Sequence, residues 1–388
     1  MSKIISIGTA VPAYIHRQED LLPFMQRIYA LEKGNSRKLK FLYQQSGIST
    51  RASVIPDYSR PAAEWEFYPP TENLEPFPSL ELRMKLYRQH AKPLSLQAIR
   101  RCLEGVGASR DGDAASGADA RAGGDAASGG GMDAREITHL ITVSCTGMSA
   151  PGLDLELVEA LQLPQTVFRT SVNFMGCYAA VHALKLADAL VRTAAGARVL
   201  IVCTELCTLH FQQEPTLDNM LSSLLFADGS AAALVVSDDY AGKGMRLSHF
   251  YSEIVPEGKK EMTWDLSSTG FRMTLTSYVT DLIRADFAGL VGNALKQSQK
   301  QYEEISHWCV HPGGKKILDA IYKCLSFTNG HLDDSYKVLN QYGNMSSPTI
   351  LFVLKRILDG VDYNQPNCIF GAAFGPGLTM ETFIGETT

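Results

Sequence analysis

The sequence predicts an α/β protein in which helices cover β-sheets made mostly of parallel strands. This class follows first from short apolar runs of β-rich composition that alternate with longer segments of helical periodicity. It follows also from composition, since the 388 residues are 45% hydrophobic and 20% charged, as in a globular protein. A chain of this length can bury about 75% of its unfolded surface without a disulfide or a metal.

The apolar runs and the periodic segments give the expected elements in order. We expect strands at residues 3–8, 138–144, 198–204, 231–237, 246–253, 306–310, 368–373 and 378–384. We expect helices at residues 80–103, 153–161, 178–192, 282–301, 314–324 and 347–358. Between residues 105 and 131, 24 of 27 residues are Gly, Ala, Ser or Asp, which cannot form a core. This segment is therefore predicted to be a flexible surface insertion.

The spacing of the elements indicates an internal duplication. Cys177 opens a helix 39 residues after a strand that begins at Thr138, and Asn344 precedes a helix 38 residues after a strand that begins at Ser306. We therefore divide the chain into an N-terminal half, residues 1–238, and a C-terminal half, residues 239–388. Common βα connection lengths could produce the same agreement by chance, and spacing alone leaves this alternative open.

Charge and cysteine content argue against several classes of function. Lys plus Arg number 36 and Asp plus Glu 41, so the net charge of −5 does not favour nucleic acid or an anionic membrane as partner. No apolar run reaches the roughly 18–20 residues of a membrane span, and the first residues do not read as a signal peptide. The eight cysteines contain no Cys-x-x-Cys pair and no zinc-like spacing, so we expect free thiols, no metal and a cytoplasmic location.

Three short motifs carry residues that can do chemistry. Cys177 follows Gly176 at a helix start, where unpaired N–H groups and the helix dipole favour the thiolate. His311 lies between a buried strand and Pro-Gly-Gly, which would hold the imidazole at the carboxyl end of that strand. Asn344 follows Gly343 in a turn before a helix, and its amide could point into the same cavity. A core cysteine, a structural histidine and an N-cap asparagine remain the alternatives.

A fourth motif completes a recognisable set. Phe374, Gly375, Pro376 and Gly377 connect two strands, either as a simple hairpin turn or as a rigid loop that shapes the floor of a pocket. In order and spacing, the four motifs resemble type III polyketide synthases, the chalcone and stilbene synthase-like enzymes. The resemblance runs from Ile4 to Ile384, apart from the insertion and residues 55–77. It implies a homodimer with the thiolase fold, in which two duplicated βαβαβαββ halves form five αβαβα layers.

The resemblance also implies roles for these residues. Cys177 would carry the starter and the growing chain as a thioester. His311 would support the thiolate and, with Asn344, hydrogen-bond the malonyl thioester carbonyl that becomes an enolate on decarboxylation. Phe226 matches the family's gating phenylalanine, although core packing explains it equally well. The substrates would be malonyl-CoA and an acyl-CoA starter, with no further cofactor.

The chain departs from plant chalcone synthases around the implied cavity. Trp264 replaces a glycine, Met273 a second gating phenylalanine, Cys145 and His210 two threonines, and Ala150 a methionine that crosses the dimer, whereas Ser346 matches. These changes predict poor use of a bulky aromatic starter and better use of aliphatic ones, with a pyrone, resorcinol or related phenolic as product. Arg51 is the best-matched candidate for binding the CoA phosphates, with Lys38 or Lys40 as further candidates.

Three other functions stay open on the sequence. A ketoacyl-carrier-protein synthase III-like enzyme also uses Cys, His and Asn, but performs one extension only. A papain-like hydrolase has the same order of residues, although its cysteine normally lies near the mature N-terminus in a different local motif. A catalytically silent binding protein is the third alternative. Release of CO2 from malonyl-CoA would distinguish a condensing enzyme from a hydrolase or a binding protein.

Overall fold

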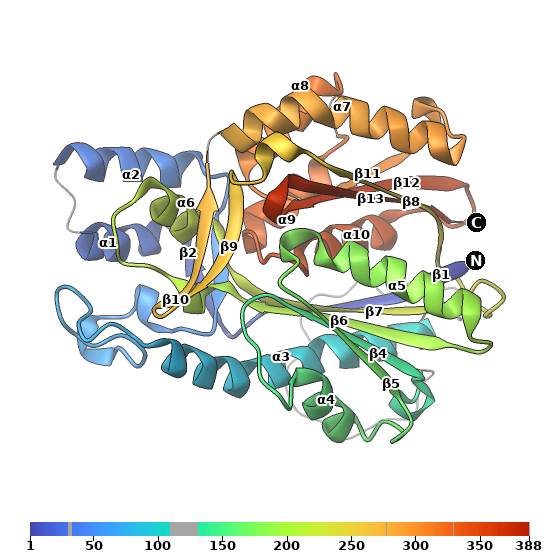
Figure 1. Ribbon diagram of the computed structural model, residues 1–388, viewed down its shortest axis with the longest axis horizontal. Coiled ribbons are helices and arrows are strands. Elements are labelled where there is room, and N and C mark those ends of the chain that lie inside the picture. Colours follow the sequence, from blue (N-terminus) through green and yellow to red (C-terminus); the bar gives the residue numbers. More distant parts are fainter. Residues whose placement is uncertain (30–32, 109–130, 277, 329, 388) are drawn as a thin grey trace.

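The protein is built from five layers of secondary structure. A computed structural model describes the whole chain except residues 30–32, 109–130, 277, 329 and 388. Helices α7 (Tyr278–Ser298) and α8 (Lys315–Cys324) cover one outer face, and α3 (Leu80–Ala108) and α4 (Leu153–Leu161) cover the other (Figure 1). Between the two sheet layers lie α5 (Ala179–Thr193), α9 (Asp333–Tyr342) and α10 (Thr349–Gly360). The expected αβαβα arrangement is confirmed.

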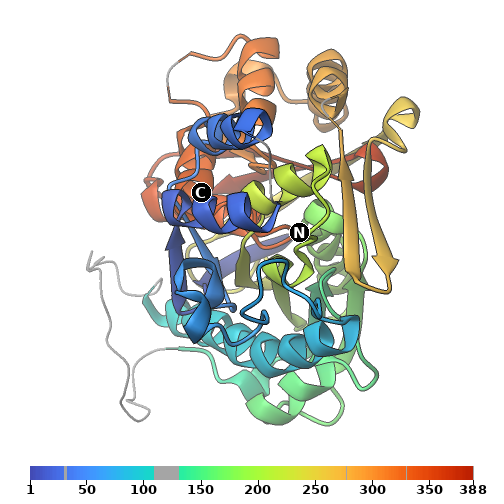
Figure 2. The same ribbon diagram turned by 90° about the vertical axis from the view of Figure 1, so that its left-hand side faces the viewer.

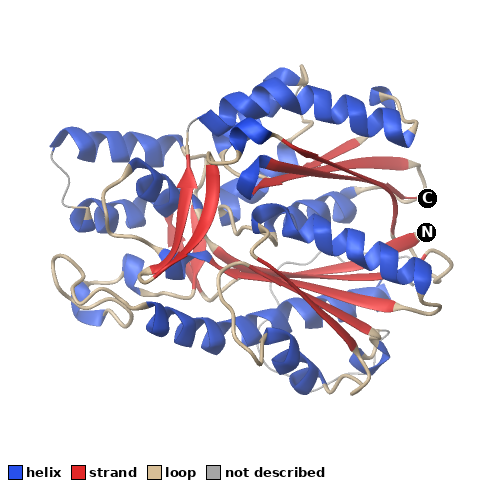
Figure 3. Ribbon diagram, in the orientation of Figure 1, coloured by secondary structure: helices blue, strands red, loops and turns tan. Residues whose placement is uncertain are grey.

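The two sheet layers are joined at one end. The nine strands follow the order β11-β12-β13-β8-β1-β7-β6-β4-β5. Their bounds are β1 (Ser2–Ala10), β4 (His139–Ser144), β5 (Phe168–Asn173), β6 (Arg198–Leu206), β7 (Asp228–Ser237), β8 (Met245–Ile254), β11 (His307–Val310), β12 (Asn367–Gly375) and β13 (Thr379–Thr387). Strands β1 and β8 form the junction between the two layers, and they pair over three residues only, Ser2–Ile4 with Met245–Leu247. Beyond this junction the two layers diverge, and the central helices lie between them (Figure 3).

The two halves have similar orders of elements that differ at one position. Apart from β2 (Tyr14–Arg17), β3 (Thr50–Ser53), α1 (Gln18–Ile28), α2 (Lys33–Gln45) and α6 (Leu217–Leu225), the first half runs β1-α3-β4-α4-β5-α5-β6-β7, which is the expected βαβαβαββ sequence. The second half runs β8-α7-β11-α8-α9-α10-β12-β13, so in the described residues α9 stands where the first half has β5. The expectation of mostly parallel sheets is wrong. Only β4–β5, β4–β6 and β11–β12 pair in parallel in the large sheet, because β7 runs antiparallel to β6 and to β1, and β13 runs antiparallel to β12 and to β8.

Small side chains allow α5 to lie between two sheets. Ala179, Ala180, Ala183 and Ala187 of this helix are completely buried. These small side chains let the helix lie close to both sheets, while its polar side chains His182 and Lys185 pair with Glu381. The nucleophile motif lies directly before this helix, so the interior of the fold sets where Cys177 can stand.

The sequence did not predict the elements that close one end of the molecule. These are α1 (Gln18–Ile28), α2 (Lys33–Gln45), α6 (Leu217–Leu225) and two antiparallel pairs, β2 (Tyr14–Arg17) with β3 (Thr50–Ser53) and β9 (Met262–Ser267) with β10 (Gly270–Leu275). Helices α1, α2 and α6 and the β9–β10 hairpin gather at this end (Figure 2).

Most of the predicted insertion, residues 109–130, lies outside the described residues. Residues 105–108 do not belong to it, because they form the last turn of α3, where the side chain of Val106 is buried. Within the described part of the chain, no helix is both long and apolar enough to cross a membrane.

Candidate active site

Cys177, His311 and Asn344 meet in one inner cavity of about 320 Å³. They come from three separate elements. Cys177 lies in the turn before α5, His311 follows β11, and Asn344 follows α9. The remaining lining residues are mostly apolar: Phe226, Met262, Met273, Leu275, Gly313, Ile317 and Phe374. The site therefore exists only when both halves of the chain are folded against each other.

Glycines fix the turn that presents Cys177. Gly176 has φ +75°, and a Cβ at this position would lie 2.1 Å from Cδ of Pro376, so no other residue fits without displacement. A Cβ on Gly375 would likewise lie 2.4 Å from the ring of Tyr178. The loop 374–377 therefore packs directly against the turn of the nucleophile, while only its Phe374 reaches the inner cavity.

Burial controls the protonation of the site. It raises the pKa of Cys177 to about 11, and hydrogen bonds from Ser346 and Asn344 oppose this only in part. Burial also lowers the pKa of His311 to about 3, and neither ring nitrogen has a hydrogen-bond partner among the described residues. Desolvation of the thiol opposes the effect of the helix start, which by itself favours a thiolate. Burial thus disfavours the charged forms of both the thiol and the imidazole.

The turn at Asn344 joins the two halves. Its backbone N–H donates to Leu225 O and its carbonyl accepts from Ala227 N, both at 2.9 Å, so the turn pairs with the chain on either side of Phe226. The side-chain Oδ1 accepts from Ser346 N at 2.8 Å. Asn344 is not an N-cap, because Pro348 occupies that position before α10. Its amide is instead held in a fixed orientation beside the cavity.

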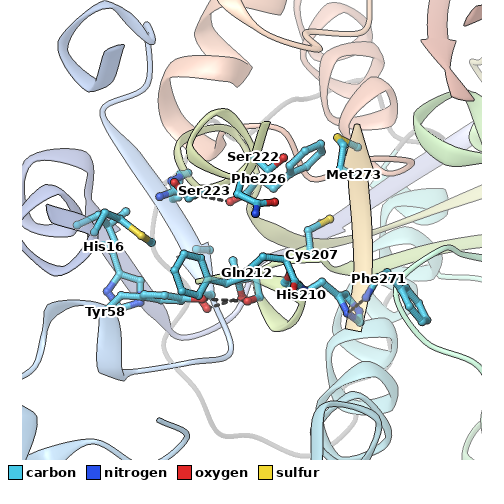
Figure 4. A pocket seen from close by; sticks show the side chains of 18 of the residues that line it. His16, Tyr58, Cys207, His210, Gln212, Ser222, Ser223, Phe226, Phe271 and Met273 are labelled. Atoms are coloured by element: carbon cyan, nitrogen blue, oxygen red, sulfur yellow. Dashed lines mark hydrogen bonds between the residues drawn. The ribbon is translucent and has the colours of Figure 1, made fainter. Parts of the chain in front are cut away.

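Phe226 and Met273 separate the inner cavity from a larger outer one. Both residues line both cavities, and their side chains lie side by side (Figure 4). The outer cavity has a volume of about 620 Å³, part of it open to solvent. Its other lining residues include Leu21 and Met25 of α1, Tyr58, Phe211, Ser222, Ser223, Cys207, His210, Trp264 and Phe271.

Three aromatic side chains narrow the outer cavity. His210 stacks on Phe271 with ring centroids 4.2 Å apart and 6° between the planes, and Trp264 meets both rings edge-on at 5.8 Å. His210 is a neutral ring with a defined tautomer, since Nε2 donates to Thr146 O and Nδ1 accepts from Phe271 N. Burial lowers its pKa to about 3. This wall is therefore rigid and uncharged.

Several expected site residues lie elsewhere. Cys145 lines neither cavity; its Sγ accepts from Gly176 N at 3.1 Å, and its carbonyl accepts from Trp264 Nε1 at 2.7 Å, so it supports the nucleophile turn from behind. Ser346 is buried beneath the site and also lines neither cavity. Gly375, Pro376 and Gly377 act through packing and do not line either cavity.

Arg51, which was expected to bind the CoA phosphates, lines the outer cavity but is largely buried. Its side chain is only 5% exposed, Nε donates to Gln18 Oε1 at 2.9 Å, and Nη1 donates to the carbonyl of Phe226. A guanidinium with these partners faces the interior of the protein. It holds the backbone of the residue between the two cavities instead of standing at the surface. Lys38 and Lys40 are exposed on α2.

The sequence reasoning missed Glu205. This glutamate is fully buried at the end of β6, where its carboxylate accepts from Cys145 N, Thr146 Oγ1 and Ser347 Oγ. Burial raises its pKa to about 7 against the effect of these hydrogen bonds. A single acidic residue in the apolar run Arg198–Leu206 was the available signal. In the described residues, no three His, Cys, Asp or Glu side chains are grouped so as to hold a metal ion.

Two family models match most of this chain. The model of the N-terminal domain of chalcone and stilbene synthases matches residues 116–239, and that of the C-terminal domain matches residues 246–387. Among curated proteins, Probable polyketide synthase 1 of Dictyostelium discoideum is 28% identical over 387 residues, which cover 98% of this chain but only 11% of that protein. The α-pyrone synthesis polyketide synthase-like Pks18 of Mycobacterium tuberculosis is 27% identical, covering 98% of this chain and 90% of Pks18.

Two solved structures have similar folds along the whole chain. PKS-I from the brown alga Ectocarpus siliculosus has a TM-score of 0.86 and 25% identity, covering 100% of this chain and 98% of its own. The C-terminal type III polyketide synthase domain of Steely1, a type I/III hybrid from Dictyostelium, has a TM-score of 0.86 and 26% identity, covering 100% and 99%. Because the two domain models together match more than half of the residues, the chain belongs to the chalcone and stilbene synthase family, the type III polyketide synthases, which are acyltransferases that use CoA thioesters.

Proposed function

We propose that Cys177, His311 and Asn344 carry out decarboxylative condensation of malonyl-CoA units onto an acyl-CoA starter. The observation that supports this most is the convergence of the three side chains, from both halves of the chain, in one largely apolar cavity. An apolar site strengthens the interaction between fixed donors and a developing negative charge. The single-extension and hydrolase alternatives receive no comparable support, since the family is that of type III polyketide synthases.

Each proposed step uses groups that the site provides. Sγ of Cys177 attacks the starter thioester carbonyl, the new C–Sγ bond replaces the C–S bond to CoA, and CoA leaves as the thiol. The imidazole of His311, whose ring nitrogens have no partner among the described residues, takes up the thiol proton during this attack and passes it to the sulfur of the leaving CoA. His311 and Asn344 then hydrogen-bond the malonyl thioester oxygen. Loss of CO2 places the negative charge on that oxygen. The enolate carbon then attacks the Cys177 thioester carbonyl, the C–Sγ bond breaks, Cys177 leaves as a thiolate, and the extended chain stays on CoA.

The outer cavity supports an aliphatic starter. The packed rings of Trp264, His210 and Phe271 narrow the outer cavity. Apolar side chains of α1, Leu21 and Met25, line another part of the same cavity. A flexible alkyl chain can bend past such a constriction more readily than a planar aromatic group. We therefore propose a pyrone, resorcinol or related phenolic product. One relative, Pks18, carries the description α-pyrone synthesis.

The proposal includes a homodimer in the cytoplasm. Strand β5 is the last strand of its sheet, and Phe168 of β5 and Met148 nearby are 57% and 47% exposed. An open edge strand with exposed apolar side chains favours association with a second copy. The thiols of all eight cysteines are free, as expected for a reducing compartment. Net charge gives no reason to add nucleic acid or a membrane as partner.

Product analysis tests the proposal directly. Purified protein is incubated with malonyl-CoA and either hexanoyl-CoA or p-coumaroyl-CoA, and CO2 release and products are followed by mass spectrometry. We expect extended, cyclised products with higher kcat/KM for the aliphatic starter, and a fall in CO2 release of about 10²–10³ for Asn344→Ala. Normal CO2 release by Asn344→Ala would remove this residue from the mechanism. Efficient formation of naringenin chalcone would overturn the assignment of the starter.

A further inference from the structure

The carboxyl end of α6 is held by groups from both halves of the chain. A helix leaves its last carbonyls without partners inside the helix, so these carbonyls must find donors elsewhere. The carbonyl of Leu225, the last residue of α6, accepts from Asn344 N at 2.9 Å. The carbonyl of Phe226, the next residue, accepts from Nη1 of Arg51. A residue that lines both cavities and the turn of Asn344 therefore meet at one helix end, beside a buried cation.

Arg51 holds this helix end with two nitrogens of its guanidinium. From its place on β3, Nε donates to Gln18 Oε1 at 2.9 Å, while Nη1 donates to the carbonyl of Phe226. The amide of Gln18 in turn donates to the carbonyl of Leu224 at 2.8 Å. A guanidinium holds two acceptors in a fixed geometry, and its positive charge is favourable at the negative end of a helix dipole. The carboxyl end of α6 is therefore fixed against β3 and the start of α1.

The aliphatic part of Arg51 also packs against the turn that carries Asn344. A Cβ on Gly343 would lie 3.0 Å from both Cγ and Cδ of Arg51, and 3.0 Å from the carbonyl of Leu225. Only glycine fits this position without displacement, and its φ of +69° favours glycine as well. One side chain thus contacts the residue directly before Asn344 and also holds the backbone of Phe226. A shift of the Asn344 turn towards β3 would displace Arg51.

The amide of Asn344 depends on the position of this turn. Its Oδ1 accepts from Ser346 N at 2.8 Å, which is a bond within the turn itself. Its Nδ2 lies 3.4 Å from the carbonyl of Gly313, a separation that is long for a hydrogen bond and holds the amide weakly. The place of the amide beside the inner cavity is therefore set by the contacts that fix the backbone of the turn, and Arg51 supplies one of these contacts.

We propose that Arg51 is a positioning residue for decarboxylation, which acts by holding the turn of Asn344 against the end of α6. The inference rests on the proposed function, in which the amide of Asn344 hydrogen-bonds the malonyl thioester oxygen. A donor stabilises a developing oxyanion when it is already in place, and a displacement of about 1 Å can cost about 10²-fold in rate. Loss of the guanidinium frees the carbonyl of Phe226 and opens space beside Gly343, so the turn can move away from His311.

Two malonyl thioesters separate positioning from a direct contact with the CoA phosphates. Malonyl-CoA carries the phosphates, whereas malonyl-pantetheine has the same thioester and arm without them. Release of CO2 from each is measured for wild type, Arg51→Met and Arg51→Lys. For both variants we expect kcat to fall about tenfold or more with either thioester, while KM changes less than about twofold. Lysine should not rescue kcat, because one ammonium group does not reproduce the two-pronged geometry. A rise in KM for malonyl-CoA alone, restored by lysine, would assign Arg51 to the phosphates and overturn the proposal.

A double-mutant cycle tests whether Arg51 acts through Asn344. Asn344→Ala alone should lower CO2 release about 10²–10³-fold. Addition of Arg51→Met to this variant should cost less than about threefold more, because the amide that Arg51 positions is already absent. A smaller fraction of folded protein would instead lower the rate by the same factor in both backgrounds. Losses that multiply in the double variant would therefore contradict the positioning role.

A second variant leaves Arg51 in place and removes a partner of its guanidinium. Gln18→Leu deletes the acceptor of Nε, and we expect kcat to fall about threefold or more with both thioesters. An unchanged kcat in this variant would overturn the proposal even if Arg51→Met does not fold. Arg17→Met is the matched control on the paired strand β2, since the Arg17 side chain is 68% exposed, and it should leave kcat and KM unchanged. Wild-type protein that releases no CO2 from either thioester would overturn the proposed function itself.

Discussion

The side chains of Glu205 and Ser347 join the two halves of the chain directly behind the nucleophile. Ser347 Oγ donates to Glu205 Oε1 at 2.7 Å, and both residues are completely buried. The other carboxylate oxygen accepts from Cys145 N and from the hydroxyl of Thr146, each at 2.8 Å. Because the thiol sulfur of Cys145 accepts from Gly176 N, one carboxylate connects the turn of Asn344 with the turn of Cys177.

Glu205→Gln should make the stability of the protein less dependent on pH. The folded-state pKa of Glu205 is about 7, above the value of about 4.3 for an unfolded glutamate, so the folded state binds the extra proton between these values. The free energy of unfolding therefore falls as pH rises through this range, by about 3 kcal/mol for this group alone. Glutamine does not titrate, so the substitution should abolish this pH dependence, while its side-chain oxygen still accepts the hydrogen bonds from Cys145 N and Thr146 Oγ1.

Urea unfolding of both proteins at pH 4.5 and pH 7.5 measures this difference. The free energy of unfolding of the wild-type protein, minus that of Glu205→Gln, should be smaller at pH 7.5 than at pH 4.5. Glu205→Ala serves as control, since it leaves buried donors without partners and should destabilise the protein at both pH values. An unchanged difference between wild type and the Gln variant would show that Glu205 ionises normally.

Alkylation of Cys177 should depend steeply on pH. With a pKa of about 11, the thiolate is a small fraction of the total at neutral pH and grows about tenfold per pH unit. The rate of inactivation by iodoacetamide should therefore rise about tenfold per unit between pH 7 and pH 9. Glu205→Gln should react faster than wild type above pH 7, because the charge of Glu205 raises the pKa of Cys177. A pH-independent rate across this range would instead reveal a preformed thiolate.

Cys177→Ala should separate the two halves of the reaction. Without Sγ there is no attachment point for the starter, so extended product should disappear. His311 and Asn344 remain in the same cavity, and we expect slow release of CO2 from malonyl-CoA to continue. Mass spectrometry of the products and radiolabelled CO2 measure the two activities. Extended product from the alanine variant would show that another group is the nucleophile.

Trp264→Gly should widen the choice of starter. Removal of the indole takes away the edge-on ring that closes the outer cavity against His210 and Phe271. We expect the ratio of kcat/KM for p-coumaroyl-CoA over hexanoyl-CoA to increase several-fold, with a loss of stability of about 3 kcal/mol or more. Trp264→Phe is the matched control: it keeps most of the bulk but loses the hydrogen bond to the carbonyl of Cys145. An equal change of the ratio in both variants would assign the effect to that hydrogen bond.

Replacement of residues 109–130 by a short Gly/Ser linker should leave activity and Tm nearly unchanged. The described residues on either side are already close, since Met132 N donates to Leu103 O at 3.2 Å. The boundary matters, because a replacement that starts at Gly105 also removes Val106 from the core, at a cost of about 1.5–3 kcal/mol. Thermal unfolding of both variants distinguishes these cases. A large loss of Tm or activity in the shorter replacement would show that the segment packs or functions.

The sequence by itself was sufficient for the class of fold, the order of its main elements and the three residues at the inner cavity. Local chemistry explains this success. Gly176 and Gly343 have positive φ values of 75° and 69°, so the turns that carry Cys177 and Asn344 are specified by the glycines beside them. Short irregular segments such as β2 and β3 have no such local signal, because four residues are too few for a periodic pattern.

Only the tertiary structure decided how these residues behave chemically. A helix start favours a thiolate, but the pKa of Cys177 depends on water removed by segments far apart in the chain, and this desolvation raises it. The same holds for Arg51, which local sequence presents as a surface cation and which the fold buries against Gln18 and Phe226. Strand direction and cavity shape depend likewise on contacts between distant segments, and neither solvent exposure nor electrostatic coupling is written in any local stretch of residues.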